Sequence, residues 1–349
     1  MISKKGITIN MKLRSLMQAA KNVPVSRVWE KAKEAHKLCG KPTTSLFVDM
    51  LRCANKYGAG PTDYMMFEFW CLDDAERATY LTRVRSAAFV KRVNNRTDAA
   101  IFNDKNAFFE KFRPLMGREA INLFTCTEEE FAAFMADKDD VIVKPVDLDC
   151  GSGIEKLYKK DFSDLHELWV YVKNPAKRLG IAEEVIRQHP QAAALHPDSI
   201  NCIRVATFVQ DGTPHVIYAA CKAGTNGVAF DNMGRGGITM RFDLDTGRIC
   251  GQGHDEELVK HDVHPTTGVV LKGYQMPFHE EVKALALKAA MMYPEFRYVG
   301  WDICMTKNGP AIIEGNDYPG YDLAQIPDEG DPHPRQGLIP LFTKLGITV

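Results

Sequence analysis

The chain has 349 residues, of which 45% are hydrophobic and 26% are charged, and its formal net charge is −1. This length is enough for two packed domains, and the balanced charge argues against a nucleic-acid-binding protein or a polybasic membrane anchor. No stretch of sequence approaches the ~20 apolar residues that span a bilayer, and the N-terminus lacks the apolar core of a signal peptide. The nine cysteines are scattered without a C-x-x-C pair, which favours a protein of the reducing cytoplasm.

The first hundred residues are predicted to form helices separated by prolines. Apolar residues recur at helical spacing in residues 25–38 and 44–57. Asp73 precedes an acidic first turn that is typical of a helix start. We therefore expect an N-terminal helical region at residues 1–100 and a connecting segment at residues 101–138.

From about residue 120 short strands alternate with helices. The sequence predicts a helix at residues 128–135 with a capping box that begins at Thr127, and residues 277–293 form the clearest amphipathic helix. The predicted strands are 121–124, 140–146, 181–186, 202–209, 215–221, 236–244 and a hairpin at 298–316. Interleaved strands and helices indicate an α+β or mixed α/β fold, which we divide into residues 139–190 and 191–340.

Residues 298–316, YVGWDICMTKNGPAIIEGN, are predicted to pair as a hairpin. A three-residue loop at Lys307-Asn308-Gly309 places Asp302 opposite Glu314. Asn316 shares the face of Glu314 because side chains alternate along a strand. Facing like charges destabilise a hairpin unless a cation lies between them, and Mg²⁺ is often held by one or two carboxylates together with phosphates. A bulge in the three-residue loop would shift this register, and the alternative interpretation of the acidic residues is a solvated hairpin end.

Lys144 lies in the predicted strand 140–146, and the glycine-rich loop Gly151-Ser152-Gly153 follows that strand. Glycine allows backbone N–H groups to approach an anion closely, and a lysine adds a point charge. The spacing is not that of a P-loop, and by itself the loop sequence is typical of a plain turn.

Arg204 lies in the apolar strand 202–209, where a charge requires a partner. This partner is either a structural ion pair or a bound phosphate. Glu183-Glu184-Val185-Ile186 places two more charges at another apolar strand.

Residues 229–240, AFDNMGRGGITM, form a further candidate site. Asn232, Arg235 and Gly236-Gly237 have the composition of a backbone nest for a carboxylate or phosphate oxygen. A plain glycine turn before a strand would explain the glycines but would leave the asparagine and the arginine without a role.

A different class of site is suggested by residues 253–264, which place His254, His261 and His264 within eleven residues. Histidine and aspartate ligate zinc, as in a zinc hydrolase. No helical H-E-x-x-H is present and Pro265 follows the last histidine, so a polar surface loop is the favoured interpretation.

The order and spacing of these motifs resembles the ATP-grasp superfamily, and in particular the sugar-transfer-associated ATP-grasp family. The matching stretches cover about residues 57–325. They are YGAGPTDYMMFEF, NDKNAFFEKF, VIVKP with its GSG loop, EEVI, SINCIRVATF, FDNMGRGGI, HPTTGVVLKGYQMP and GWDICMT with GPAIIEGN.

This resemblance implies an ATP-grasp fold, in which two α+β lobes close on ATP. Lys105 and Lys144 then resemble the two nucleotide lysines, residues 151–153 the lid loop, and residues 183–186 the hinge that reads adenine and ribose. Arg204 resembles the arginine near the γ-phosphate. The metal ligands for Mg²⁺ or Mn²⁺ would be Asp302, Glu314 and Asn316.

The implied activity is that of a carboxylate–amine ligase, which forms an amide through an acyl phosphate and releases ADP and phosphate. Its partners would be small carboxylate and amine substrates, for example a sugar acid and an amino acid in polysaccharide or secondary metabolism, with the carboxylate bound by residues 232–237. A phosphotransferase without an amine acceptor and a nucleotide-binding regulator without turnover are the alternatives. A homodimer is compatible with the sequence.

Overall fold

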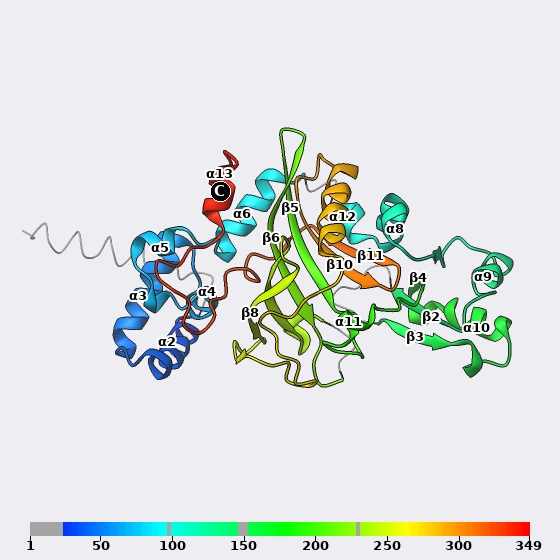
Figure 1. The fold of residues 1–349 in the computed structure, drawn as a ribbon, viewed down its shortest axis with the longest axis horizontal. Coiled ribbons are helices and arrows are strands. Elements are labelled where there is room, and N and C mark those ends of the chain that lie inside the picture. The colour runs from blue at the N-terminus through cyan, green and yellow to red at the C-terminus, as the bar shows by residue number, and fades with distance from the viewer. Residues whose placement is uncertain (1–23, 96–98, 146–152, 228–230) are drawn as a thin grey trace, which may run out of the picture. The chain divides into compact units, whose positions relative to one another are not determined.

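The computed structural model describes residues 24–95, 99–145, 153–227 and 231–349 (Figure 1). The chain divides into two compact units. The first comprises the residues up to Arg92 together with Gly320–Val349, and the second comprises Val93–Pro319. The C-terminal thirty residues therefore group with the N-terminal helices, a division that the boundaries drawn from the sequence did not anticipate.

The first unit is helical, as predicted. Helices α2 (Val25–Cys39) and α3 (Thr43–Tyr57) confirm the two helices expected from apolar periodicity. Each begins after a proline and ends at a glycine with positive φ, which satisfies the last carbonyls of the helix. The shorter helices are α4 (Pro61–Met66), η2 (Phe69–Cys71), α5 (Asp74–Ala78), α6 (Arg83–Val93) and α13 (Ile339–Lys344).

Polar side chains join the C-terminal segment to this unit. The Gln325 side chain accepts a hydrogen bond from the Leu81 N–H and donates one to the Leu81 carbonyl, each at 2.9 Å. The Tyr321 hydroxyl donates to buried Asp63 at 2.7 Å. Because these contacts satisfy buried backbone groups, the segment is an integral part of the helical unit.

The second unit contains a four-stranded antiparallel sheet in the order β1-β4-β2-β3. Helices α9 (Glu128–Phe134) and α10 (Leu165–Val172) pack their apolar residues against it, and Thr127 forms the predicted capping box at the start of α9. The strands are β1 (Ala120–Asn122), β2 (Asp140–Pro145), β3 (Glu155–Tyr158) and β4 (Leu179–Glu184).

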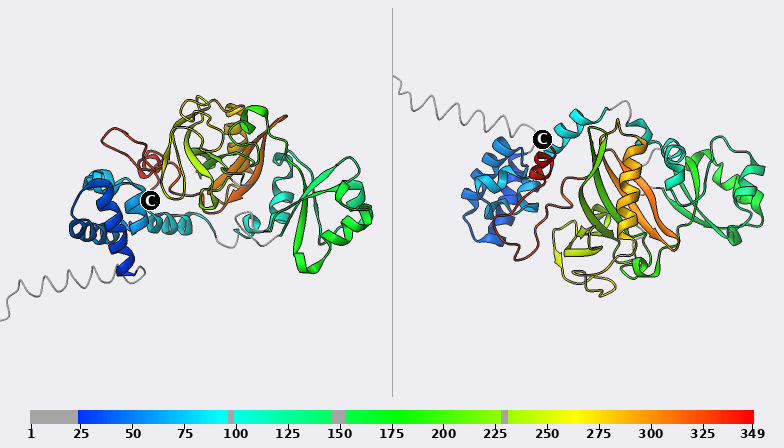
Figure 2. Two further views of the ribbon diagram at one scale, coloured as in Figure 1. Left: turned by 90° about the horizontal axis from the view of Figure 1, so that it is seen from below. Right: turned by 45° about the horizontal axis from the view of Figure 1, so that its top comes forward.

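The second unit also contains a seven-stranded antiparallel sheet in the order β11-β10-β5-β6-β7-β8-β9. Helix α12 (His279–Met292) lies along one face of this sheet in Figure 1 and in the right-hand view of Figure 2. The strands are β5 (Cys202–Gln210), β6 (Thr213–Ala223), β7 (Ile238–Asp243), β8 (Arg248–His254), β9 (Lys260–His261), β10 (Tyr298–Thr306) and β11 (Gly309–Asn316). Short helices α7 (Ala100–Asn103), α8 (Lys105–Phe112) and α11 (Pro190–Ala193) complete the unit.

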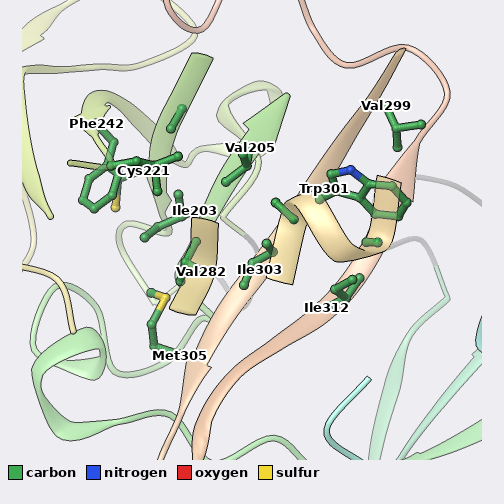
Figure 3. Packing of buried hydrophobic residues seen from close by; sticks show 14 of the residues in the cluster. Ile203, Val205, Cys221, Phe242, Val282, Val299, Trp301, Ile303, Met305 and Ile312 are labelled. Atoms are coloured by element: carbon green, nitrogen blue, oxygen red, sulfur yellow. The ribbon is translucent and has the colours of Figure 1, made fainter. Parts of the chain in front are cut away.

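The seven-stranded sheet has one apolar and one polar face because side chains alternate along each strand. Ile203, Ile303 and Trp301 point into the core with Val282 of α12, as Figure 3 shows. The residues between them on the same strands face the other way and include charged side chains. This polar face carries the candidate site.

The hairpin of β10 and β11 pairs Asp302 with Glu314 as predicted, but its loop is shorter than predicted and a bulge interrupts the second strand. Thr306 pairs with Gly309, so the loop has two residues rather than the three expected. The pairing continues to Ile303 opposite Ile312, whereas a three-residue loop would have placed Ile313 there. A bulge then inserts Ile313, and Asp302 pairs with Glu314 as predicted.

In the described part of the chain, no helix is both long and apolar enough to cross a membrane.

Candidate functional site

Asp302, Glu314 and Asn316 gather on the polar face of β10 and β11. Asp302 is buried and lies directly opposite Glu314. The Asn316 amide nitrogen donates to the Gly300 carbonyl at 3.3 Å and to Glu314 Oε1 at 3.4 Å. The predicted register of the two carboxylates is therefore confirmed, and the Asn316 side chain lies beside Glu314.

Two buried cations neutralise Asp302. Arg204 binds it bidentately through Nε and Nη2, the latter at 2.8 Å, and Lys222 Nζ lies 3.0 Å from Oδ2. Burial alone would raise the pKa of Asp302, but Arg204 and Lys222 outweigh this effect and hold the pKa well below its usual range. Of the two alternatives for Arg204, the structure shows the ion pair; a contact with phosphate stays a prediction.

Glu314 differs from Asp302 in having no lysine or arginine within ion-pair distance among the described residues. Its side chain is accessible to solvent although protein atoms surround it densely. Desolvation by these atoms and the negative charge of Asp302 raise the pKa of Glu314, and the more distant cations do not cancel the rise. An under-neutralised carboxylate beside an amide oxygen fits a hard divalent cation.

The four-stranded sheet contributes a second ion-pair group. Lys144 Nζ on β2 lies 2.8 Å from Glu183 Oε1 on β4, and Arg118 Nε lies 2.7 Å from Glu183 Oε2. Burial would raise the pKa of Glu183, but Arg118 and Lys144 lower it to about 2. The positive charge of Lys144 acts to lower the pKa of Glu314, so this ion-pair group contributes to the electrostatics of the same site.

The remaining nucleotide-binding residues predicted from the sequence lie at element ends. Lys105 is the first residue of α8. Gly153 has φ of +71°, a conformation that favours glycine, while Gly151 and Ser152 lie outside the described residues. Glu184 ends β4 and precedes Val185 and Ile186. Recognition of adenine and ribose by residues 183–186 stays a prediction.

The glycine loop before β7 does not form the predicted backbone nest. Asn232 Oδ1 accepts from the Gly234 N–H, and the Asn232 carbonyl accepts from the N–H groups of Arg235 and Gly237, each at 3.0 Å. The Gly236 N–H is also used, because it donates to a carbonyl within the same turn. With these donors engaged, binding of a carboxylate here would depend on the Arg235 side chain, which is exposed.

Sequence reasoning missed Lys222, Asp231 and Arg118. Lys222 is the penultimate residue of β6, and its Nζ also lies 3.3 Å from Asp231 Oδ1. Lys222 shares with Arg204 the signal that was visible in the sequence: a charged residue in an apolar strand, which needs a partner when buried. Nothing in the sequence around Arg118 signals its contacts, because they involve residues distant along the chain.

Two of the three histidines of the zinc alternative, His261 and His264, contact different residues. His254 is buried in β8, and His264 is buried with Nε2 2.8 Å from the Gly224 carbonyl, so the predicted surface loop is wrong for both. His261 Nε2 contacts Asp255 at 2.9 Å. Within the described ranges, no three His, Cys, Asp or Glu side chains are grouped so as to hold a metal ion.

The sequence profile of the sugar-transfer associated ATP-grasp family matches residues 84–336. This match covers well over half of the chain, which confirms the resemblance in motif order: the protein belongs to the sugar-transfer associated ATP-grasp family. The α+β architecture with an N-terminal helical region is the fold predicted from that resemblance. A search of curated proteins finds no match.

Solved structures of ATP-grasp ligases are similar to the chain at low sequence identity. The ligase PsnB, complexed with a minimal precursor, has a TM-score of 0.42 and 19% identity over 78% of this chain and 70% of its own. D-alanyl-alanine synthetase A from Vibrio cholerae has a TM-score of 0.43 and 11% identity over 73% and 63%. The D-alanine-D-alanine ligase from Coxiella burnetii has a TM-score of 0.39 and 11% identity over 73% and 56%. The chain thus spans less than two thirds of the last two proteins.

Proposed function

We propose that the protein is an ATP-dependent carboxylate–amine ligase that forms an amide through an acyl phosphate and releases ADP and phosphate. The observation that carries this proposal is the facing pair Asp302–Glu314, with Asn316 beside it and buried cations around it. Arg204 and Lys222 neutralise Asp302 but leave Glu314 under-neutralised, and a bound divalent cation would offset the charge of Glu314.

Glu314, Asn316 and the remaining lone pairs of Asp302 would hold Mg²⁺ or Mn²⁺. This ion would neutralise charge on the triphosphate of ATP. All three residues offer oxygen ligands, which suits a hard cation. Desolvation and the negative charge of Asp302 raise the pKa of Glu314, and such an ion would offset that negative charge.

The cations of the site keep hydrogen-bond donors for phosphate oxygens. Arg204 has five N–H groups, of which three are used by Asp302 and the Pro319 carbonyl. Lys222 directs two of its three N–H groups to Asp231 and Asp302. Lys144 Nζ lies 2.8 Å from Oε1 and 2.9 Å from Oε2 of Glu183. These fixed donors would stabilise the charge that develops on the transferred phosphoryl group.

In the proposed reaction, an oxygen of the substrate carboxylate attacks the γ-phosphorus of ATP, and ADP leaves. The amine nitrogen then attacks the acyl carbon, the bond to phosphate breaks, and the amine proton passes to solvent. No side chain of the protein acts as a nucleophile. Excluding water from the acyl phosphate would prevent its hydrolysis.

Trapping with hydroxylamine tests the chemistry without knowledge of the natural amine. The protein would be incubated with Mg–ATP, a panel of sugar acids and amino acids, and hydroxylamine, and the products would be ADP, phosphate and a hydroxamate. Formation of AMP would refute the proposal, since it requires attack at the α-phosphorus. A stable phosphorylated product would identify a phosphotransferase instead.

The carboxylate substrate is proposed to bind at Arg235. The family description associates these proteins with sugar transfer, so a sugar acid joined to an amino acid is the proposed substrate pair. Arg235→Ala should raise KM for the carboxylate while leaving KM for ATP unchanged. Arg27→Ala, which removes an exposed arginine from α2, is the matched control. An unchanged carboxylate KM in Arg235→Ala would place the substrate elsewhere.

A further inference from the structure

Arg118 makes contacts that neither the nucleotide nor the metal site explains directly. It lies between η3 (Arg113–Leu115) and β1, and its side chain is 2% exposed. Its Nε donates to Glu183 at 2.7 Å, its Nη1 to the Ile312 carbonyl at 2.7 Å, and its Nη2 to the Ile313 carbonyl at 3.4 Å. One guanidinium thus joins β4 of the four-stranded sheet to β11 of the seven-stranded sheet.

The two carbonyls bound by Arg118 belong to the bulge in β11. Residues from the turn to Ile312 pair with β10 in one register, and the extra residue Ile313 shifts the pairing by one. If Ile313 instead paired regularly with Asp302, Glu314 would fall opposite Trp301 and point toward the apolar face of the sheet. The side of the sheet to which Glu314 points therefore depends on the bulge.

A bulge leaves backbone groups outside the regular ladder, and buried backbone groups require partners. Arg118 supplies two of its donors to the carbonyls of the bulged segment. A lysine at this position would offer a single point of donation and could not reproduce the planar fork.

Arg118 also affects Lys144, because both side chains bind the carboxylate of Glu183. Glu183 gives one oxygen to Arg118 and is also paired with Lys144, so the two cations share one carboxylate. Without Arg118, Glu183 would interact with Lys144 alone, and the lysine would be less available to a phosphate.

We infer that Arg118 is a positioning residue that fixes the bulge at Ile313, so that Glu314 faces Asp302, and that couples this arrangement to Lys144 through Glu183. This inference rests on the proposed function for its consequence, which is a weaker metal–nucleotide site when Arg118 is lost. Its structural part, control of the bulge, stands independently of any activity.

The test compares Arg118→Ala and Arg118→Lys with the wild type and with Arg77→Lys. Arg77 is the matched control because it is a buried arginine that binds both a carboxylate, Asp49, and a carbonyl, that of Phe69, within the helical unit. Amide hydrogen exchange of residues 311–316 reports on the bulge in the free protein. Mn²⁺ binding in the presence of a non-hydrolysable ATP analogue, followed by electron paramagnetic resonance of free Mn²⁺, reports on the site.

We expect both Arg118 variants to exchange faster at residues 311–316 and to bind Mn²⁺ about 10-fold or more weakly, as is common when a partner of a metal ligand is removed. Added guanidinium at millimolar concentration should restore Mn²⁺ affinity to Arg118→Ala but not to Arg118→Lys. Arg77→Lys should melt at a lower temperature with unchanged Mn²⁺ affinity. A loss of stability alone would not respond to guanidinium in this selective way.

Wild-type exchange at residues 311–316 in both Arg118 variants would overturn the inference. So would wild-type Mn²⁺ affinity in both. If Arg118→Ala does not fold, Arg118→Lys decides, because it keeps the charge and the bulk. If the wild type itself fails to bind Mn²⁺ with nucleotide, the proposed function fails, while the exchange data still decide whether Arg118 holds the bulge.

Discussion

Replacing Glu314 with glutamine would remove one of the two facing charges on β10 and β11 while keeping the shape of the side chain. We expect Glu314→Gln to make the free protein more stable and to weaken Mg²⁺-dependent nucleotide binding. Stability and function should move in opposite directions because a residue kept for binding can be unfavourable in the unliganded fold.

The size of the stabilisation follows from the geometry of the pair. Directly opposite residues lie about 5 Å apart, and at an effective dielectric constant of about 20 two unit charges at this distance repel by about 3 kcal/mol. Arg204 and Lys222 neutralise Asp302, and Glu314 is accessible to solvent, so most of this repulsion is screened. We expect a net gain of about 0.5–1 kcal/mol, which corresponds to a rise in Tm of about 1–4 °C.

The stabilisation expected for Glu314→Gln should depend on pH, because the pKa of Glu314 is shifted in the folded protein. Desolvation and Asp302 raise the pKa of Glu314 in the folded protein. A carboxyl group with a raised pKa favours the fold while it is protonated and loses that contribution as pH rises through the folded-state pKa. The Tm difference between Glu314→Gln and the wild type should therefore be near zero below about pH 4, close to the usual glutamate pKa, and should grow toward neutral pH.

Thermal melts over this pH range and calorimetric titration with Mg²⁺ and a non-hydrolysable ATP analogue measure both effects. Glu256→Gln is the control, because Glu256 is an exposed glutamate in the loop after β8 and its replacement changes the net charge equally. A Tm difference for Glu314→Gln that is the same at all pH values, or that equals the control, would refute the electrostatic reasoning.

The other predictions concern the buried ion pairs and a helix cap. Asp302→Asn leaves Arg204 and Lys222 without their shared counter-charge, so urea denaturation should show a loss of about 3–5 kcal/mol, and kcat/KM for ATP should fall by on the order of 10² or more. Lys144→Ala should lower kcat/KM by a similar factor, on the order of 10², because it removes one fixed cation from the proposed phosphoryl-transfer site; near-wild-type turnover in both variants would contradict the proposed function. Thr127→Ala removes the cap of α9 and should lower the free energy of unfolding by about 1 kcal/mol while KM for ATP stays unchanged; a changed KM would show that α9 acts on the site.

Local patterns were sufficient to predict most helices and the strand content. Prolines at the starts and glycines at the ends delimit α2 and α3, and the capping box at Thr127 starts α9. The facing register of Asp302 and Glu314 was also predicted, although from a three-residue loop. A two-residue loop with a later bulge adds the same single residue to the second strand, so the two arrangements place the carboxylates alike.

The bulge and the buried ion pairs could not be predicted because their partners are far away in sequence. Arg118 binds the Ile313 carbonyl across 195 positions, and Arg204 binds Asp302 across 98. The sequence showed that Arg204 needed a partner but offered several acidic residues as candidates. The backbone nest at residues 232–237 failed for a related reason, because its composition cannot show that the N–H groups are already used within the turn.

The division of charge on the polar face separates the roles of the two carboxylates. Asp302 is buried and already satisfied by two cations, so a metal ion would compete there with Arg204 and Lys222. Glu314 is accessible to solvent and under-neutralised, so it gains most from a bound divalent cation. We therefore expect Glu314 to provide most of the metal affinity, whereas Asp302 mainly holds the two cations in the positions where phosphate oxygens would meet them. Loss of Asp302 should then reduce stability and turnover together, whereas loss of Glu314 should weaken metal binding and raise the stability of the free protein.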